Sequence, residues 1–281
     1  MIELSANRYG KAAIRLVRVS RGPDGHRLRD LTVAIALEGD FSAAHTDGDN
    51  SMVIATDTMK NTAYAYARTY LDGSLEDYGR ALAEHFRDAP QVDVATVNIK
   101  GHHWSHIDVA GTAAPDAFVR GGEGTRVATI TTTRTGTTIE AGVEDLVVMK
   151  TSRSAFSGFP RDAYTTLPET DDRLMATRVT AIWRYGSPGL DYDTVFSAVR
   201  TTLLEVFADH DSPSVQTSIW IMAKAILDRH DEVDEVRMVL PNLHHWLVDL
   251  TPFGLDNDRE IYTPTTEPHG LIEATVRRGE G

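Results

Sequence analysis

The sequence predicts an α+β protein in which antiparallel sheets carry helices on one face. Strand-like and helix-like segments follow one another as strand–strand–helix–helix–strand–strand, and this order occurs twice along the 281 residues. Turn-forming residues separate the first two strands and predict a hairpin. The two halves share the order of elements without visible sequence identity. We therefore expect two tandem units, residues 1–133 and residues 134–281, each a four-stranded sheet covered by two helices.

The first half begins with two strands, Ile14–Val19 and Leu31–Leu37, which the turn Gly22-Pro23-Asp24-Gly25 connects. One helix is expected near Asp57, a good N-cap residue, and a second at Ser74, which opens a capping-box-like pair. Strand-like segments then return at residues 92–94, 97–99 and 127–130.

The second half repeats this pattern after a hairpin tip at residues 134–137, with strands expected at residues 146–149 and 179–183. Two helices follow, and the second has Ser212 as N-cap and Pro213 at its first position. The apolar stripe of the first helix is Val195, Val199, Leu203 and Val206, and that of the second is Val215, Ile219, Met222 and Ile226. The closing strands are expected at residues 236–240 and 246–250.

Composition describes a globular chain with an acidic balance. Hydrophobic residues make up 41% and charged residues 25%, which allows a sizeable core. The 28 Lys and Arg residues stand against 41 Asp and Glu, a formal net charge of −13. Nucleic acids and anionic membranes bind clustered cations, so we expect neither as a partner. An anionic ligand would need a local basic residue that overcomes the overall negative field.

The sequence also lacks several signals. It has no cysteine, which excludes disulfides, thiolate metal sites, iron–sulfur clusters and cysteine nucleophiles. The N-terminus has no basic region followed by an apolar core, no apolar run is long enough to span a membrane, and the last residues are not Ser-Lys-Leu. We expect a cytoplasmic protein.

Two local motifs are candidate ligand sites, one for a phosphate and one for a metal. Gly121-Gly122-Glu123-Gly124 follows no clear strand and opens no helix, so it is a poor phosphate loop. His102, His103 and His106 lie in strand-like surroundings, where His102 and His106 would share one sheet face. They are either metal ligands or polar side chains of a strand face. We favour the second interpretation, because no third ligand or supporting shell is evident.

The segment Asn50–Thr62 runs from an apolar strand-like stretch directly into a helix start, with Thr56 and Asp57 at the junction. Together with Tyr9-Gly10-Lys11 upstream, and with further motifs in family order over most of the chain, it resembles the urate oxidase family. The resemblance implies two tandem tunnelling-fold (T-fold) ββααββ units per chain and a barrel-shaped homotetramer with a central tunnel. It also implies that urate, dioxygen and water give 5-hydroxyisourate and hydrogen peroxide in purine degradation, without a cofactor or a metal.

In the first half, the resemblance implies a catalytic pair. A Lys at a strand start is usually a solvated surface residue, and Thr and Asp at a helix start are usually capping groups. In the family, a Lys and a Thr in such motifs form a dyad, which implies Lys11 and Thr56 here, with Asp57 adjacent. A lysine amine whose pKa is lowered by desolvation or neighbouring cations accepts the Thr proton, and the Thr relays a proton from substrate or water.

In the second half, the resemblance implies the substrate-binding residues. Phe156 stacks on the flat purine, and Arg173 places its planar donors on an anionic edge of urate. Alone, these would be interpreted as a core aromatic and a solvated cation. Val215 and Gln216 fall in the first turn of a helix, where free N–H groups and the dipole favour an anion. The Gln216 amide offers both a donor and an acceptor to an oxopurine edge.

Asn242 and His244 lie at an expected strand end after Pro241. An Asn amide can donate to dioxygen, peroxide or water above the ring, which is the role expected of Asn242. His244, two residues on, would face the same side and could relay protons at neutral pH, whereas His245 would point the other way. In the family, the dyad and the substrate-binding residues come from different subunits, so the resemblance places active sites at subunit interfaces.

Two other classes of function remain open. One is a different purine- or pterin-using T-fold enzyme, such as a cyclohydrolase, with a metal at His102, His103 or His106. The other is a non-catalytic purine-binding oligomer, which would bind urate without consuming oxygen. The motif set favours the oxidase over both, since a binding protein has no need of a Lys–Thr relay.

Overall fold

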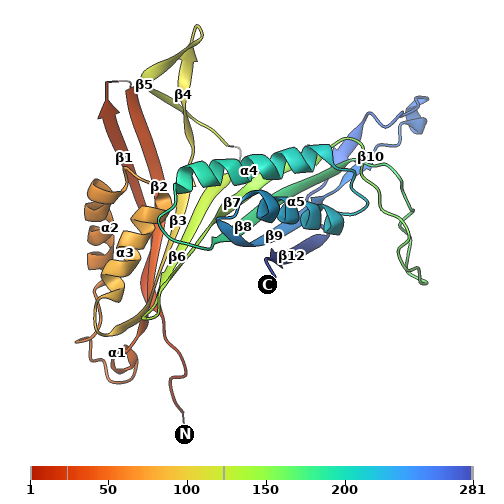
Figure 1. The fold of residues 1–281 in the computed structure, drawn as a ribbon. Helices are drawn as coiled ribbons and strands as arrows, with labels where there is room; N and C mark the ends of the chain where they lie inside the picture. The colour runs from red at the N-terminus through yellow and green to blue at the C-terminus, as the bar shows by residue number, and fades with distance from the viewer. Residues whose placement is uncertain (1, 24, 123, 280–281) are drawn as a thin grey trace. The chain divides into compact units, whose positions relative to one another are not determined.

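The computed structural model describes residues 2–23, 25–122 and 124–279 (Figure 1). The chain folds into two compact units. Unit 1 comprises Met1–Gly142 and Arg184–Thr194, and unit 2 comprises Val143–Trp183 and Val195–Gly281. The predicted α+β class is confirmed, because the ββααββ order occurs twice, with short elements inserted, and the described strand registers are antiparallel. The repeat boundary at residue 133 stays a prediction, since the compact units reflect packing and not element order.

Unit 1 contains strands in the order β1-β2-β3-β6-β7. Its two long helices, α2 and α3, lie against the same face of these strands (Figure 1). A short helix and a separate two-stranded sheet, β4–β5, are inserted between these elements. The elements are β1 (Tyr9–Gly22), β2 (Gly25–Gly39), α1 (Ser42–Thr46), α2 (Thr56–Tyr70), α3 (Leu75–Arg87), β3 (Val92–His102), β4 (Trp104–Val109), β5 (Thr112–Arg120), β6 (Thr125–Thr132) and β7 (Thr137–Lys150).

The predicted first hairpin and the second helix are confirmed. Gly22 pairs with Gly25 at the end of the hairpin, and Asp24 of the predicted turn lies outside the described residues. The Ser74 hydroxyl caps α3 by accepting the Asp77 amide at 3.0 Å. The apolar faces of β2 and α3 are buried and consist of Leu31, Val33, Ile35 and Leu37 on the strand, and Leu75, Tyr78, Leu82 and Phe86 on the helix.

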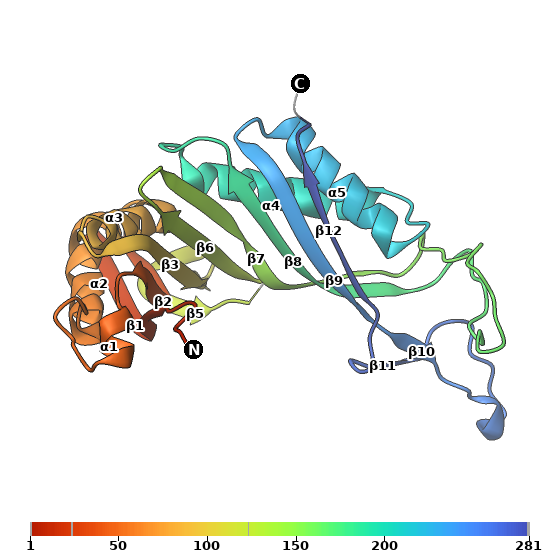
Figure 2. The same cartoon turned by 90° about the horizontal axis from the view of Figure 1, so that it is seen from below.

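Unit 2 contains the end of β7 and strands in the order β7-β8-β9-β12. Figure 2 shows α4 and α5 on one face of these strands. A second small sheet, β10–β11, lies between β9 and β12 in the chain. The elements are β8 (Met175–Tyr185), α4 (Tyr192–Asp209), α5 (Val215–Arg229), β9 (Val233–Leu243), β10 (His245–Leu247), the 3-10 helix η1 (Thr251–Phe253), β11 (Tyr262–Pro264) and β12 (Leu271–Arg277).

The predicted stripes of α4 and α5 are buried as expected, but the start of α5 differs. Ser214, and not Ser212, is the N-cap, because Ser214 has extended backbone and its hydroxyl accepts the Thr217 amide at 3.2 Å. The Ser212 backbone pairs instead with a neighbouring segment, through its contact with Arg153. None of the helices among the described residues is long and apolar enough to cross a membrane.

Three expectations about strands are wrong. The closing strand predicted at residues 246–250 ends at Leu247, because exposed apolar residues there enter the small β10–β11 sheet, and β12 pairs with β9 instead. Gly121–Gly124 does follow a strand, since it connects β5 to β6, although Glu123 lies outside the described residues. His102 and His106 do not share one strand, because β3 ends at His102 and β4 begins at Trp104.

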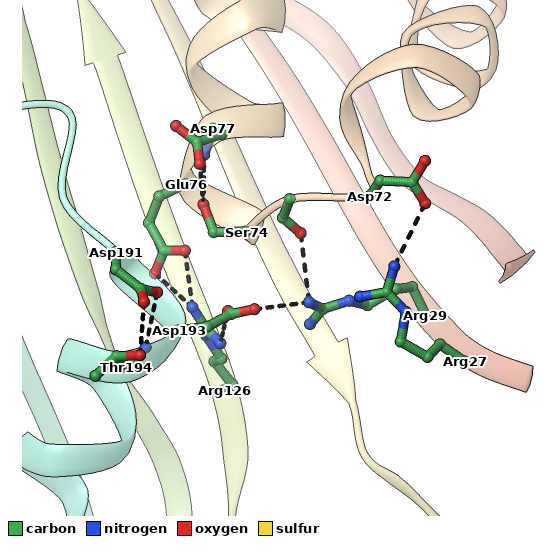
Figure 3. Close-up of polar contacts among 11 residues, drawn as sticks. Arg27, Arg29, Asp72, Ser74, Glu76, Asp77, Arg126, Asp191, Asp193 and Thr194 are labelled. Carbon is green, nitrogen blue, oxygen red and sulfur yellow. Dashed lines mark hydrogen bonds and ion pairs between the residues drawn. The ribbon is translucent and has the colours of Figure 1, made fainter. Parts of the chain in front are cut away.

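A buried ion-pair network joins residues of unit 1 that come from four elements (Figure 3). The Glu76 side chain on α3 is fully buried, and Arg126 on β6 donates to its two oxygens at 3.1 and 2.8 Å. Arg126 also pairs with Asp193, in the first turn of α4, at 2.5 Å, and Arg29 on β2 pairs with Asp193 at 2.7 Å. Burial raises the pKa of Glu76, and the charge of Arg126 opposes this shift. The network therefore depends on Arg126.

Replacing Arg126 with Met should lower the free energy of unfolding by about 3–5 kcal/mol, because Glu76 would remain as a buried carboxylate without its cation. Urea unfolding followed by circular dichroism measures this change. Arg134→Met is the control, since Arg134 and Asp93 form a pair at 2.9 Å with both side chains more than half exposed. That variant should lose about 1 kcal/mol or less. Equal losses in the two variants would contradict a structural role for the buried network.

Candidate active site

The predicted site residues fall into two groups, one in each unit. Lys11, Thr56 and Asp57 belong to unit 1. The residues of the second group all belong to unit 2 and are Phe156, Arg173, Val215, Gln216, Asn242 and His244. Within each unit, charge and ring interactions relate some members of the group: Lys11 with Asp57, and Arg173 with Phe156 and His244.

Lys11 lies at the start of β1, where β1 and β2 approach closely. A Cβ atom on Gly10 would lie 1.9 Å from the carbonyl oxygen of Ile35, so only glycine fits there. A β-bulge follows between Lys11 and Ile14, and Ala13 within it has a φ of 55°. The close approach and the bulge fix the backbone on both sides of the half-buried Lys11.

Tyr9 connects the start of β1 to the segment that precedes α2. Its hydroxyl accepts a hydrogen bond from the Ile54 amide at 2.8 Å and donates one to the Ile54 carbonyl at 3.2 Å. Its ring meets Phe41 edge to face, with 4.7 Å between centroids. Since Tyr9 is two residues from Lys11 and Ile54 is two residues from Thr56, this contact relates the two members of the predicted dyad. Tyr9 belongs to the Tyr9-Gly10-Lys11 motif, but the sequence carried no signal that Ile54 is its partner.

Thr56 and Asp57 are the first two residues of α2, so the expectation that Asp57 is the N-cap is wrong. Ala55 occupies that position without a side-chain hydrogen bond. The Asp57 carboxylate instead accepts hydrogen bonds from Lys60 and, at 3.0 Å, from Asn61. The hydrogen bond and charge of Lys60, with a smaller contribution from the charge of Lys11, lower the pKa of Asp57.

Lys11 therefore lies within electrostatic reach of the N-terminus of α2, which also packs against β1. Among the residues that the structure describes, no hydrogen bond joins Lys11 to Thr56. The structure thus brings the predicted dyad into one neighbourhood without connecting its two side chains.

In unit 2, residues 153–156 form an irregular segment that gathers the predicted substrate-binding residues. The segment makes a parallel bridge with Ser212 on one side and an antiparallel bridge with Thr170 on the other. Five backbone hydrogen bonds of 2.7 to 3.0 Å connect it to these neighbours, including one from the Arg173 amide to the Ser154 carbonyl. Phe156 and Arg173 are thereby held close together, next to the residues that lead into α5.

The Arg173 guanidinium lies over the ring of Phe156, with its central carbon 5.3 Å from the ring centroid. Its Nε is buried without a hydrogen-bond partner, and none of the described carboxylates pairs with it. Burial lowers the pKa of Arg173, but guanidinium groups stay charged in proteins. A partly buried cation beside a flat ring suits a flat anion, whose oxygens would supply the missing acceptors.

A second ring, Phe159, stacks on Phe156, with 4.9 Å between centroids and an angle of 14° between planes. The sequence carried no signal for this stacking. Val215 and Gln216 form the first turn of α5, where Val215 is buried and Gln216 is exposed. The free N–H groups of this turn lie just beyond Ser212, so the helix N-terminus adjoins the segment that carries Phe156.

Asn242 lies at the end of β9, and His244 falls between β9 and β10. The alternation argument for His244 and His245 therefore does not apply, because strand geometry stops at Leu243. The His244 ring stacks with Trp246 at 5.4 Å. Burial lowers the pKa of His244, and the positive charge of the nearby Arg173 lowers it further, so both favour the neutral imidazole.

The histidines considered as metal ligands are engaged in hydrogen bonds. His102 contacts Thr32 at 2.8 Å and Arg120 at 3.0 Å, and the ring nitrogens of His103 and His106 contact Ser105 and a backbone carbonyl. Within residues 2–23, 25–122 and 124–279, no group of three or more His, Asp or Glu side chains is arranged to hold a metal ion.

The fold and these arrangements define a tunnelling-fold protein with a cationic, aromatic candidate site in unit 2. The uricase family model matches residues 7–131 and 139–273. A uricase from Arthrobacter globiformis is 44% identical, over 99% of this chain and 90% of the relative, and a uricase from Dictyostelium discoideum is 38% identical, over 99% and 98%. The crystal structure of the A. globiformis uricase matches with a TM-score of 0.93 at 43% identity, covering 100% of this chain and 96% of that chain.

The chain therefore belongs to the uricase family, the urate oxidases, and is an oxidoreductase. The predicted family is confirmed. These similarities do not favour the alternative of a cyclohydrolase-like enzyme.

Replacing Tyr9 with Phe should lower the turnover number by up to about thirtyfold, because the loss of two hydrogen bonds to Ile54, at about 1 kcal/mol for each bond, frees the segment before Thr56. Steady-state oxidation of urate measures the effect. Tyr66→Phe is the control, since the Tyr66 hydroxyl contacts His85 between α2 and α3 and makes no hydrogen bond to Ile54. A Tyr9→Phe enzyme with the turnover of the control would show that this contact does not set the site.

Replacing Arg173 with Ala should raise the pKa of His244, because removing a nearby positive charge favours the protonated imidazole. An NMR titration of the His244 ring, assigned with a His244→Gln variant, measures the shift. Arg161→Ala is the control, because Arg161 lies 5.8 Å from the Phe159 ring in the same region but does not act on His244. An unchanged or lower pKa in Arg173→Ala would refute the coupling.

Proposed function

We propose that this chain oxidises urate with dioxygen and water to 5-hydroxyisourate and hydrogen peroxide, as a step of purine degradation that needs no cofactor. The observation that carries the proposal is the unpaired Arg173 guanidinium over the Phe156 ring, beside the N-terminus of α5. Urate is a flat anion, and this arrangement offers it a ring face, a planar cation and free helix N–H groups. Family membership over nearly the whole chain supports the same reaction.

Urate binding is assigned to the residues of unit 2. Arg173 donates two parallel hydrogen bonds to an anionic edge of urate, and Phe156 covers one face of the ring system. Gln216 pairs with the mixed donor and acceptor edge through its amide, while the backbone N–H near Val215 adds a donor at the helix N-terminus.

Proton transfer is assigned to Lys11, Thr56 and His244. Removing a proton from bound urate leaves an electron-rich dianion that can reduce dioxygen directly. Lys11, through the Thr56 hydroxyl, and His244, whose lowered pKa favours the neutral imidazole, together take up this one proton. Asp57 orients this pair from the adjacent position. Two electrons leave the urate dianion and, with the proton taken up by these residues and one proton from solvent, reduce dioxygen to hydrogen peroxide; water then adds to the oxidised ring.

Asn242 and Thr56 are assigned to hold the oxygen species, and then the attacking water, over the ring. As the family resemblance implies, we propose a homotetramer in which Lys11 and Thr56 of one subunit and the unit 2 residues of another form each active site at a subunit interface. Exposed apolar side chains on the terminal strands of the sheet order, Val17 on β1 and Leu271 on β12, support such contacts. We place the enzyme in the cytoplasm.

The function is tested by mixing chelator-treated protein with urate in air and following three quantities. Urate absorbance in the near ultraviolet should fall, oxygen should be consumed in matching amount, and hydrogen peroxide should appear. Loss of neither urate nor oxygen would contradict the oxidase function. Activity that returns only when a metal is added would contradict the cofactor-free reaction.

Replacing Lys11 with Met should lower turnover by about a hundredfold or more, because a positioned acid–base group is lost, while urate binding stays close to normal. Replacing Arg173 with Ala should weaken urate binding about tenfold or more, because a charged hydrogen bond is lost. Turnover and anaerobic urate binding separate the two effects. The controls are Lys224→Met and Arg161→Ala, which remove exposed cations of unit 2. Normal turnover in Lys11→Met, or normal affinity in Arg173→Ala, would refute the assigned role.

A further inference from the structure

A chain of buried side-chain hydrogen bonds leads from the end of α4 toward the candidate site in unit 2. The His210 Nδ1 lies 2.7 Å from the Val206 carbonyl, and its Nε2 lies 2.8 Å from the Ser218 hydroxyl. The Ser218 hydroxyl lies 2.8 Å from the Ser212 hydroxyl. Ser212 and Ser218 are almost fully buried, so neither hydroxyl exchanges these partners for water.

The chemistry of the end groups sets the direction of the chain. A carbonyl only accepts, so the His210 Nδ1 carries the proton and donates to Val206. Burial lowers the pKa of His210, which leaves its Nε2 as an acceptor. Ser218 therefore donates to His210, and Ser212 in turn donates to Ser218. His210 and Ser218 each donate one hydrogen bond and accept one, and the Ser212 hydroxyl, which also reaches the Ser214 carbonyl at 3.1 Å, is the donor at the end of this sequence.

The backbone of Ser212 is hydrogen-bonded to the segment that carries Phe156. Its carbonyl accepts the Ala155 amide at 2.7 Å, and its own amide donates to the Arg153 carbonyl at 2.9 Å. The Ser154 carbonyl in the same segment accepts the Arg173 amide at 2.7 Å. A shift of Ser212 would thus move both the ring and the guanidinium assigned to urate.

The hydrogen-bond chain ends at the C-terminus of α4. The side chains of Lys150 and Arg153, just before and at the start of residues 153–156, also bind this helix end. Lys150, only 6% exposed, donates to the carbonyls of Phe207 at 3.1 Å, Ala208 at 3.4 Å, and His210. Arg153 donates to the Ala208 and Asp209 carbonyls while its own φ is 59°, a left-handed value that a non-glycine residue adopts at a cost. Both ends of the hydrogen-bond chain, Ser212 and the C-terminus of α4, are therefore hydrogen-bonded to residues 150–156.

We propose that Ser218 and His210 are positioning residues for the substrate: they hold Ser212, and through it the Phe156–Arg173 pair, in the geometry that binds urate. The assignment rests on the proposed function for its substrate. Neither side chain touches urate, and their effect falls on affinity rather than on proton transfer.

The test compares Ser218→Ala with Thr202→Val. Thr202 on α4 makes the same kind of buried hydroxyl–histidine contact, 2.9 Å to His230, but at the opposite end of α5 and without a link to residues 153–156. Ser218→Ala should raise the KM for urate and the anaerobic urate Kd about tenfold, with the turnover number changed about twofold or less. Thr202→Val should lose similar thermal stability while its KM and Kd stay at the wild-type values.

His210→Asn provides a second variant, because its amide can still donate toward the Val206 carbonyl but leaves Ser218 without its acceptor. It should raise the KM as Ser218→Ala does, and the double variant should be no worse than either single one, since both break the same chain. Unchanged KM and Kd in both single variants, or an equal rise in Thr202→Val, would overturn the proposal.

Amide hydrogen exchange separates this proposal from the proposed function. Exchange at residues 154–156 and 173 should accelerate in Ser218→Ala and not in Thr202→Val, whether or not the protein oxidises urate. A wild-type protein that fails to consume urate would contradict the function. Exchange at these residues that is unaffected by Ser218→Ala would overturn the positioning role by itself.

Discussion

Backbone hydrogen bonding of residues 153–156 is the constraint on which the candidate site of unit 2 depends. The segment lies outside the regular strands, so its N–H and C=O groups have no ladder of their own and must find partners elsewhere. They find them in Ser212 on one side and in residues 170–173 on the other. Three segments far apart in the sequence are thereby brought together, and they carry the aromatic ring, the cation and the helix N-terminus of the site.

In unit 1, a side chain supplies the hydrogen bonds that an irregular segment needs. The segment before α2 is irregular, and the Tyr9 hydroxyl satisfies both the amide and the carbonyl of Ile54. The absence of a side chain on Gly10 allows β1 to lie close to β2 at this point. Lys11 and the N-terminus of α2 are therefore related through a few short contacts, although the two belong to elements that are more than forty residues apart.

Two arginines differ in how their charge is matched within the fold. Arg126 is largely buried and is matched by Glu76 and Asp193, so its charge is satisfied within the fold. Arg173 is partly buried beside Phe156 and has no carboxylate partner among the described residues. Leaving a desolvated cation unmatched costs stability, and an anionic ligand removes that cost. In a chain with a net charge of −13, such a local cation and a helix N-terminus provide the positive potential that an anion requires.

The sequence by itself determined the elements and the family. Periodicity located both helix pairs and most long strands, Ser74 correctly marked the start of α3, and the turn residues marked the first hairpin, because these signals are local. The motifs around Lys11, Thr56 and Arg173 were sufficient to identify urate oxidases. The assigned roles of these residues remain predictions.

Only the tertiary structure decided which residues meet. The N-cap of α2 differs from the predicted one because Asp57 pairs within its own helix, and that of α5 differs because the Ser212 backbone pairs with a neighbouring segment. The β4–β5 hairpin, β12, and the contacts of Tyr9 and Ser218 carried no local signal. Their partners lie at distances in sequence that periodicity does not encode, since long-range pairing is selected by packing and by the need to satisfy buried polar groups.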